Sequence, residues 1–347
     1  MQVEIEGKKI GDGNRPYFIA EISGNHNGKI ENALKLIRLA KESGADAVKL
    51  QTYTPETMTI ECDSDLFKVK GGLWDSYSLY DLYQWAHTPW EWHAELFAEA
   101  KKLGITCFST PFDESAVDFL EGFKVPAYKV ASFEIVDLLL IERIAQTMKP
   151  IIMSTGMANH DEIKEAIDTV KKYHNDIVVL HCVSGYPTPV EQSNIRTIPR
   201  IRQDFDVLTG LSDHTLSSTA AIASVSLGSC LIEKHFIDDR SNKGPDSEFS
   251  LNPTEFRFLV KEMTVAWHAL GEGNYELKKA EKDSIIFRRS LFFTNDIKSG
   301  EIITKENLRK IRPGNGLPPK YYEKLIGKKV TKDVKKGTPA DWGLIQD

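Results

Sequence analysis

Two histidines with a carboxylate beside them are well suited to bind a metal ion. His214 and His235 each end a short apolar run, and Glu233 lies two residues before His235. If these runs are neighbouring parallel strands, both imidazoles can bind one divalent cation that keeps open positions for water and substrate. Glu233 would share the face of His235 and could orient its ring or bind the metal through water. A metal-free pair of hydrogen-bonding histidines is equally favoured.

Ammonium and hydroxyl groups recur at the ends of other apolar runs: Lys49, Ser109, Thr110, Lys129, Ser132 and Ser154. Such a ring of groups can bind a phosphate and a carboxylate on one small substrate. Each residue taken alone is more often an ordinary surface residue. Their repetition at equivalent positions favours a binding site.

Three carboxylates stand in similar places, namely Glu21, Glu134 and Asp246, the last in Gly244-Pro-Asp. In a site they would transfer protons or bind sugar hydroxyls. The default for an isolated carboxylate is the solvated surface, so this interpretation depends on position.

Eight short apolar runs must position all of these residues. They cover residues 17–23, 45–52, 105–111, 127–134, 150–156, 177–182, 207–215 and 230–236. Segments between them, such as 30–43 and 160–174, repeat apolar residues every three and four positions, as helices do. Eight alternations of strand and helix predict an α/β protein with a closed (β/α)8 TIM barrel, whose active site lies at the carboxyl ends of the strands.

The chain is longer than one barrel needs, and its end changes character. A helical stretch at 253–270 would complete the barrel, and glycine turns then alternate with the β-type runs 289–293 and 328–331. We expect a barrel domain over 1–275, a linker over 276–287 and a small β-rich domain over 288–347. Residues 2–8 could form a hairpin that plugs the bottom of the barrel.

Charge is unevenly placed along the 347 residues. The net charge is −6, yet residues 282–347 hold 15 Lys and Arg against 8 Asp and Glu, which is +7, and leave −13 on the rest. The basic segment could dock on the acidic one, serve an anionic substrate, or be a solvated surface. A nucleic-acid-binding motif, a membrane-length apolar stretch and a signal peptide are all lacking, which favours a cytoplasmic protein without nucleic-acid or membrane partners.

The four cysteines have no metal-type spacing, and three fall within the apolar runs, which favours buried structural thiols over catalytic ones. His181 and Cys182 are adjacent, and adjacent strand residues point to opposite faces. They are therefore not expected to face one pocket together.

Nine motifs in unbroken order resemble the sialic acid synthase family: Ala20-Glu-Ile-Ser-Gly-Asn-His-Asn-Gly, Val48-Lys-Leu-Gln-Thr, Phe108-Ser-Thr-Pro-Phe, Tyr128-Lys-Val-Ala-Ser-Phe-Glu, Ser154-Thr-Gly-Met, Tyr186-Pro-Thr-Pro, Leu211-Ser-Asp-His-Thr, Glu233-Lys-His-Phe and Gly244-Pro-Asp. Arg289-Ser-Leu, Ile311-Arg-Pro-Gly-Asn-Gly and Lys335-Lys-Gly-Thr resemble the family's antifreeze-like (SAF, β-clip) domain. The resemblance covers almost the whole chain. It implies an enzyme, a transferase that condenses phosphoenolpyruvate with an open-chain acetamido sugar and releases phosphate.

The resemblance also implies roles for individual residues. His214 and His235 would hold Mn²⁺ or Mg²⁺, with Co²⁺ as a third option. Phosphoenolpyruvate would be bound by Lys49, Thr110, Lys129, Ser132, Ser154, Ser184 and Ser212. The sugar would be faced by Glu21, Gln51, Trp74, Glu134, Tyr186 and Asp246, and by Arg312 of the other chain in a domain-swapped homodimer. Glu21, Lys129, Glu134, His214 and His235 would take part in catalysis.

Branches of this family differ in the sugar that they use, so resemblance to one branch indicates the sugar substrate. Residues 71–92 hold Trp74, Trp85, Trp90 and Trp92, and resemble the pseudaminic acid synthase branch. Its substrate, 2,4-diacetamido-2,4,6-trideoxy-β-L-altropyranose, would suit an aromatic wall, although packing of a lid or dimer interface better explains most of the rings. Ser184 replaces the asparagine usual in the sialic acid branch. N-acetylneuraminate or legionaminate synthesis, a metal-dependent aldolase or heptulosonate-type synthase, and a catalytically silent sugar-binding protein are the alternatives.

Overall fold

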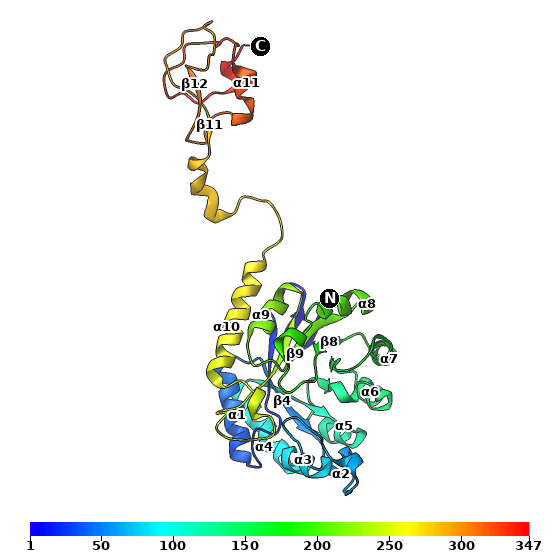
Figure 1. Cartoon of the computed structure of the whole chain (residues 1–347). Helices are drawn as coiled ribbons and strands as arrows, with labels where there is room; N and C mark the ends of the chain where they lie inside the picture. Colours follow the sequence, from blue (N-terminus) through cyan, green and yellow to red (C-terminus); the bar gives the residue numbers. More distant parts are fainter. Residues whose placement is uncertain (347) are drawn as a thin grey trace. The chain divides into compact units, whose positions relative to one another are not determined.

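Eight parallel strands form a closed barrel in the first of two units of the chain (Figure 1), as the apolar runs predict. The structure is a computed structural model that describes residues 1–346, with the first unit spanning Met1–Gly271 and the second beginning at Glu272. The barrel strands are β3 (Tyr17–Glu21), β4 (Ala47–Thr52), β5 (Thr106–Pro111), β6 (Tyr128–Val130), β7 (Ile151–Ser154), β8 (Ile177–Cys182), β9 (Leu208–Asp213) and β10 (Leu231–His235). β10 pairs with β3 and closes the barrel.

Burial on both faces explains why the strands read as continuous apolar runs. In β8, Val178 and Leu180 pack in the barrel interior. Ile177 and Val179 point outward, into the apolar layer shared with the surrounding helices. Each strand therefore contributes to two cores, and its polar residues occur mainly at its carboxyl end.

Helices surround the barrel between consecutive strands. They are α1 (Ile30–Glu42), α4 (His93–Leu103), α5 (Glu114–Glu121), α6 (Leu138–Ala145), α7 (His160–Lys171), α8 (Thr197–Phe205), α9 (Thr219–Ser226) and α10 (Pro253–Leu270). α10 begins with a capping box in which Asn252 accepts bonds from the backbone and Glu255 bonds back to Asn252. None of the helices within residues 1–346 is long and apolar enough to cross a membrane.

A hairpin precedes the barrel, as expected for the first residues. Strands β1 (Gln2–Ile5) and β2 (Lys8–Gly11) pair antiparallel. Val3, Ile5 and Ile10 share one core with residues at the amino ends of the barrel strands, such as Ala47. The hairpin thus closes the end of the barrel opposite to the carboxyl ends of the strands.

The segment between β4 and α4 is much longer than a usual strand-to-helix connection. It carries the short helix α2 (Pro55–Met58) and the amphipathic helix α3 (Leu79–Ala86). We call residues 53–92 the lid segment, since several of its side chains line the pocket described below.

The second unit holds the antiparallel pair β11 (Ser290–Phe293) and β12 (Leu308–Ile311), with the short helix α11 (Tyr322–Leu325). Its core includes Leu291, Phe293 and Leu308. In the β-type run expected at 328–331, Lys329 and Val330 form isolated antiparallel bridges, to Ile302 and Ile345, rather than a continuous strand. The region 276–287 contains a 3-10 helix at Lys279–Phe287, and the domain limits inferred from the sequence remain predictions.

Candidate active site

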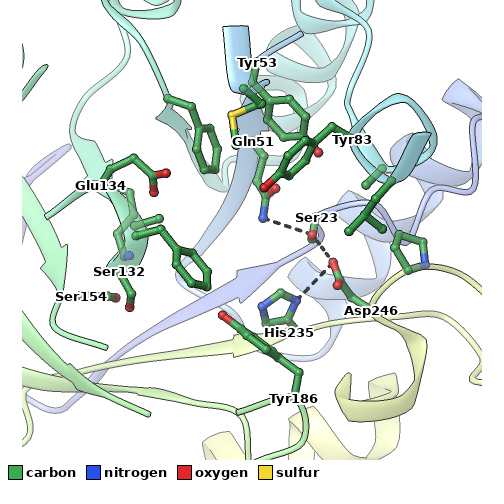
Figure 2. Close-up of a pocket in the computed structure, with 18 of the residues that line it drawn as sticks. Ser23, Gln51, Tyr53, Tyr83, Ser132, Glu134, Ser154, Tyr186, His235 and Asp246 are labelled. Carbon is green, nitrogen blue, oxygen red and sulfur yellow. Dashed lines mark hydrogen bonds and ion pairs between the residues drawn. The ribbon is translucent and has the colours of Figure 1, made fainter. Parts of the chain in front are cut away.

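A cavity of about 360 Å³ opens at the carboxyl ends of the barrel strands (Figure 2), where the fold predicts an active site. Polar side chains of the barrel line one part: Lys49, Gln51, Lys129, Ser132, Glu134, Ser154, Ser212, Glu233 and His235. Apolar side chains, many from the lid segment, line the other part. The cavity therefore has a polar part and an apolar part, and we call it two-sided for this reason.

Two buried lysines and two buried carboxylates form the floor. Lys49 pairs with Glu21 and donates to Thr110 Oγ1 at 3.1 Å. Glu233 Oε1 lies 3.6 Å from Lys49 Nζ and 3.9 Å from Lys129 Nζ. From the sequence, Glu233 could orient His235 or bind a metal through water, and in the structure its side chain lies beside the two lysines. The carboxylates hold the two ammonium groups side by side.

Burial and charge compete on these groups. Burial lowers the pKa of Lys49, but Glu21 and Glu233 outweigh it, and the net effect is a raised pKa. Burial also raises the pKa of Glu233, but Lys129 and Lys49 outweigh it and hold that pKa below its ordinary value. Lys129 has its pKa lowered, because burial exceeds the attraction of Glu233. An arriving anion would relieve the repulsion between the two cations.

Hydroxyl groups with spare bonding capacity lie beside the lysines. Ser154 Oγ and Ser184 Oγ are buried without a hydrogen-bond partner among residues 1–346. The backbone N–H of Gly156 donates to Ser132 Oγ at 3.1 Å. A Cβ at Gly156 would lie 2.1 Å from Ser184 Oγ, so only glycine fits between these serines. The arrangement can donate several bonds to phosphate or carboxylate oxygens.

The two histidines expected to bind metal are neighbours, with ring centroids 5.3 Å apart. His214 Nδ1 lies 3.1 Å from Val183 O, which can only accept, so this nitrogen carries a proton. Burial lowers the pKa of His214, but the neighbouring Cys182 and the bond to Val183 O outweigh it, and the net effect is a raised pKa. His235 Nδ1 is buried without a hydrogen-bond partner in the described chain and lies 3.8 Å from Asp246 Oδ2. Burial and nearby cations hold the pKa of His235 well below its usual value, which keeps the ring neutral, as a ligand requires.

A short polar chain connects three segments beside His235 (Figure 2). Gln51 Nε2 donates to Ser23 Oγ at 3.1 Å, and Ser23 Oγ donates to Asp246. Tyr186 packs on His214 with ring centroids 4.5 Å apart and on Trp74 at 5.5 Å. These groups border the apolar part of the cavity and can bind polar substituents of a second substrate.

Comparison with known proteins agrees with this geometry. The NeuB family model matches residues 36–275, and a SAF domain model matches residues 288–346. The chain belongs to the NeuB family. It is 44% identical over 331 residues to a pseudaminic acid synthase of Campylobacter jejuni, covering 95% of this chain and 96% of the relative. It is 45% identical over 326 residues to a pseudaminic acid synthase of Helicobacter pylori, covering 93% and 96%.

A solved structure shares the fold of this NeuB family member. The crystal structure of N-acetylneuraminic acid synthetase from Leptospira borgpetersenii in complex with citrate superposes with a TM-score of 0.74 at 29% identity. The superposition covers 82% of this chain and 95% of the Leptospira chain. The family and both of its domains, inferred from the motifs, are thereby confirmed.

Most residues singled out in the sequence of this NeuB protein line the cavity. Glu21 and Thr110 lie beneath it and contact Lys49, and Ser184 lies beside Ser132 across Gly156. Arg312 belongs to the second unit, where it is exposed with its guanidinium 5.8 Å from the ring of Phe287. The opposite directions of His181 and Cys182 are confirmed, because His181 contacts Ser193 O while Cys182 contacts His214.

Most of the clustered tryptophans pack within the protein, as expected, and one of them lines the cavity. Of the four clustered tryptophans only Trp74 lines the cavity, and its Nε1 donates to Pro245 O at 2.8 Å. Trp90 stacks on Phe119, and Trp92 packs edge-on against His26. The cavity lining also includes side chains that the sequence analysis did not assign to the site: Tyr53, Met58, Val69, Leu79, Leu82, Ala86, Phe112, Phe133 and Pro245. The amphipathic pattern of α3 is the signal that could have identified Leu79 and Leu82.

Glu134 gives a pH-dependent prediction. Burial raises its pKa to about 7, and Oε2 has no hydrogen-bond partner in the described residues. A raised pKa contributes stability below about pH 4.3, the ordinary value, and that contribution is lost as the pH rises through about 7. Glu134→Gln is therefore expected to be more stable than the wild type at pH 8 by roughly 2 kcal/mol, with a much smaller difference at pH 5.

Urea unfolding followed by tryptophan fluorescence at both pH values measures the effect, since five of the six tryptophans lie in the first unit. Glu165→Gln, at an exposed position of α7, is the matched control and should show no such difference. An equal stability change at pH 5 and pH 8 would contradict the assignment.

Proposed function

We propose that the chain condenses phosphoenolpyruvate with 2,4-diacetamido-2,4,6-trideoxy-β-L-altropyranose and water to give pseudaminic acid and phosphate. The observation that carries this proposal is the two-sided cavity. Buried lysines and hydroxyl groups lie at one part, and an apolar wall lies at the other.

The polar part suits phosphoenolpyruvate, which has a phosphate and a carboxylate on a three-carbon frame. Lys49 and Lys129 supply two positive charges on neighbouring Nζ atoms around Glu233. Ser132, Ser154, Ser184 and Thr110 supply hydroxyl groups around them, and Ser212 Oγ donates to Glu233 Oε1 at 3.2 Å. Charge-assisted hydrogen bonds of this kind bind anions more strongly than neutral ones.

The apolar part favours a sugar poor in hydroxyl groups. The proposed sugar has an acetamide at C4 and a methyl group at C6, where N-acetylmannosamine has hydroxyl groups. Leu79, Leu82 and Val69 offer no hydrogen bond to a hydroxyl. Burying an unpaired hydroxyl costs about 1–3 kcal/mol, so this wall discriminates against N-acetylmannosamine.

The two histidines fit a divalent cation, which we propose is Mn²⁺, Mg²⁺ or Co²⁺. His235 Nδ1 is buried and unpartnered in the described residues, and the hydrogen bond of His214 Nδ1 to Val183 O leaves Nε2 as the nitrogen that would bind a cation. No cluster of three or more His, Cys, Asp or Glu side chains suited to a metal occurs in residues 1–346, so water and substrate would complete the coordination. A cation bound there would act as a Lewis acid on the sugar aldehyde.

The side chains of the cavity account for the remaining steps. Lys49 and Lys129 hold phosphoenolpyruvate while its C3 attacks the aldehyde carbon, and they stabilise the phosphate that leaves. Glu134, with a pKa near 7, can accept a proton from the water that adds to C2. Gln51, Tyr186 and Asp246 orient the sugar, and the lid segment excludes bulk water.

Phosphate release tests the proposal. The protein is incubated with phosphoenolpyruvate, Mn²⁺ and one sugar at a time: the diacetamido trideoxy sugar, its legionaminate-type isomer, or N-acetylmannosamine. We expect phosphate release with the first sugar, and release that is at least tenfold slower with each of the other two. Absence of release with every sugar would refute the synthase proposal, and release with N-acetylmannosamine alone would refute the choice of sugar.

We further propose a homodimer in which Arg312 of a second copy contacts the sugar acetamido group. Support comes from the charge difference between the basic carboxyl-terminal segment and the acidic remainder of the chain. Arg312→Ala is expected to raise the sugar KM about tenfold or more and to change the phosphoenolpyruvate KM by less than twofold. Steady-state kinetics with each substrate varied measures both values. An unchanged sugar KM would argue against the swapped arrangement, and Arg309→Ala, on β12, is the matched control.

A further inference from the structure

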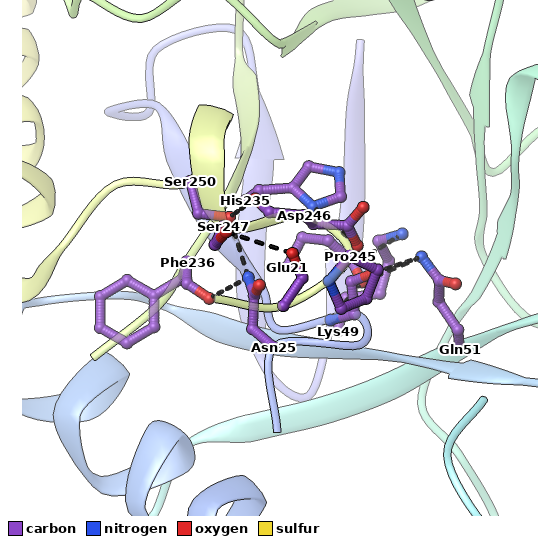
Figure 3. Close-up of polar contacts among 12 residues, drawn as sticks. Glu21, Asn25, Lys49, Gln51, His235, Phe236, Pro245, Asp246, Ser247 and Ser250 are labelled. Carbon is purple, nitrogen blue, oxygen red and sulfur yellow. Dashed lines mark hydrogen bonds and ion pairs between the residues drawn. The ribbon is translucent and has the colours of Figure 1, made fainter. Parts of the chain in front are cut away.

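Two loops meet above the barrel beside the proposed metal histidines, and Asn25 joins them (Figure 3). Asn25 lies on the loop between β3 and α1 and is 2% exposed. Its Nδ2 donates to Phe236 O at 2.9 Å and to Ser250 Oγ at 2.8 Å. Both acceptors belong to the loop between β10 and α10, which also carries Asp246.

The directions of these bonds follow from their chemistry. Phe236 O is a carbonyl and can only accept, so the amide nitrogen of Asn25 must face it. Ser250 Oγ donates its one proton to Asp246 O at 2.6 Å and therefore accepts from Asn25. An ordered chain runs from the Asn25 amide through the Ser250 hydroxyl to the backbone of Asp246, and both amide protons of Asn25 are used.

Close packing of the same two loops leaves little room for other arrangements. A Cβ at Gly24 would lie 2.5 Å from Pro245 Cγ, and a Cβ at Gly244 would lie 2.4 Å from Asn27 Oδ1. Ser23, the neighbour of Gly24, donates to the Asp246 carboxylate. The loops thus contact each other through glycine backbone, and Asp246 is held from both its backbone and its side chain.

We propose that Asn25 and Ser250 are positioning residues that hold the Asp246 carboxylate in the cavity. This inference rests on the proposed function, in which Asp246 orients the sugar. Asp246 lines the cavity, whereas Asn25 and Ser250 do not. Asn25 and Ser250 can therefore affect the substrate only through the loop that carries Asp246. Their replacement is expected to weaken binding of the sugar and not of phosphoenolpyruvate.

Kinetics of Asn25→Leu, Ser250→Ala and the double variant test the proposal. Leucine has the same number and branching of heavy atoms as asparagine, and it removes both donors. Each single variant is expected to raise the sugar KM about tenfold and to change the phosphoenolpyruvate KM by less than twofold. The double variant should be no worse than the more severe single variant, because both substitutions interrupt one chain. Ser224→Ala, which removes a buried hydroxyl bonded to Ala221 O within α9, should behave as the wild type.

A second readout does not depend on turnover. Arg240 and Lys243 are exposed on the same loop, and trypsin cleaves after both residue types. Cleavage in residues 236–250 is expected to be about tenfold faster in each variant than in the wild type. Should Asn25→Leu fail to fold, Asn25→Asp and Ser250→Ala carry the test.

The outcomes separate the two proposals. If the wild type releases no phosphate with any sugar, the proposed function fails, and faster cleavage would still support the loop restraint. Unchanged cleavage, or sugar and phosphoenolpyruvate KM values that rise in parallel, would overturn the positioning role. An unchanged sugar KM with faster cleavage would overturn it as well, because the restraint would then not reach the substrate.

Discussion

Replacing His235 with alanine is expected to lower turnover at least about a thousandfold while the protein stays folded. His235 has a buried, neutral imidazole whose Nδ1 has no hydrogen-bond partner in the described chain. The centroids of its ring and of the His214 ring lie 5.3 Å apart. A single remaining histidine binds a divalent cation weakly, so the Lewis acid that we propose for the aldehyde would be lost. Calorimetric titration with Mn²⁺ alone should show at least a tenfold weaker affinity than the wild type.

Removal of the metal and a matched histidine variant complete the experiment. Exhaustive EDTA treatment of the wild type should reproduce the loss, and added Mn²⁺ should restore activity. His181 is a buried histidine on β8 whose Nε2 contacts Ser193 O at 2.8 Å, outside the barrel interior. His181→Ala should retain most activity and metal affinity. Full activity of the EDTA-treated wild type would refute the metal role.

The barrel itself was predictable because every strand is buried on both faces. Runs such as 177–180 are apolar throughout, and polar residues follow where each strand reaches the open end. The same reasoning correctly placed Lys49, Lys129 and His235 at one rim. Periodicity thus identified the elements and the location of the site together.

Contacts between strands were not predictable in the same way. Glu21 stands opposite Lys49, and Ser212 opposite Glu233, because of the stagger of neighbouring strands in the closed barrel. That stagger cannot be read from the limits of the runs. Glu233 and His235 share one face of β10, as expected, but the side chain of Glu233 reaches lysines from β4 and β6 across the barrel interior.

The lid segment shows a second limit. An aromatic-rich stretch suggested an aromatic wall, yet large rings also fill gaps between helices, and Trp90 does so against Phe119 of α5. The apolar lining combines aromatic side chains such as Trp74 and Tyr83 with aliphatic side chains of α3, Leu79 and Leu82. One face of an amphipathic helix looks the same in sequence whether it covers a core or a cavity. Only the tertiary structure distinguishes these two cases.

Lys49→Met is expected to reduce turnover at least about a thousandfold and to destabilise the barrel unit by about 3–5 kcal/mol. Lys49 is 3% exposed and is the ion-pair partner of Glu21, with Glu233 Oε1 3.6 Å away. Without its ammonium group, two buried carboxylates lose a shared counter-ion. The cavity also loses one of the two positive charges that we propose bind phosphoenolpyruvate.

Stability and activity can be separated with a second substitution. In Lys49→Met/Glu21→Gln the carboxylate that pairs with Lys49 is made neutral, so much of the lost stability should return. Activity should not return, because the cation for the anionic substrate is still missing. Urea unfolding and the phosphoenolpyruvate KM measure the two effects, and Lys35→Met, which removes an exposed lysine paired with Asp238, is the control. Recovery of activity in the double variant would mean that Lys49 only stabilises the fold. Phosphoenolpyruvate would then have to be bound by Lys129 and the hydroxyl groups.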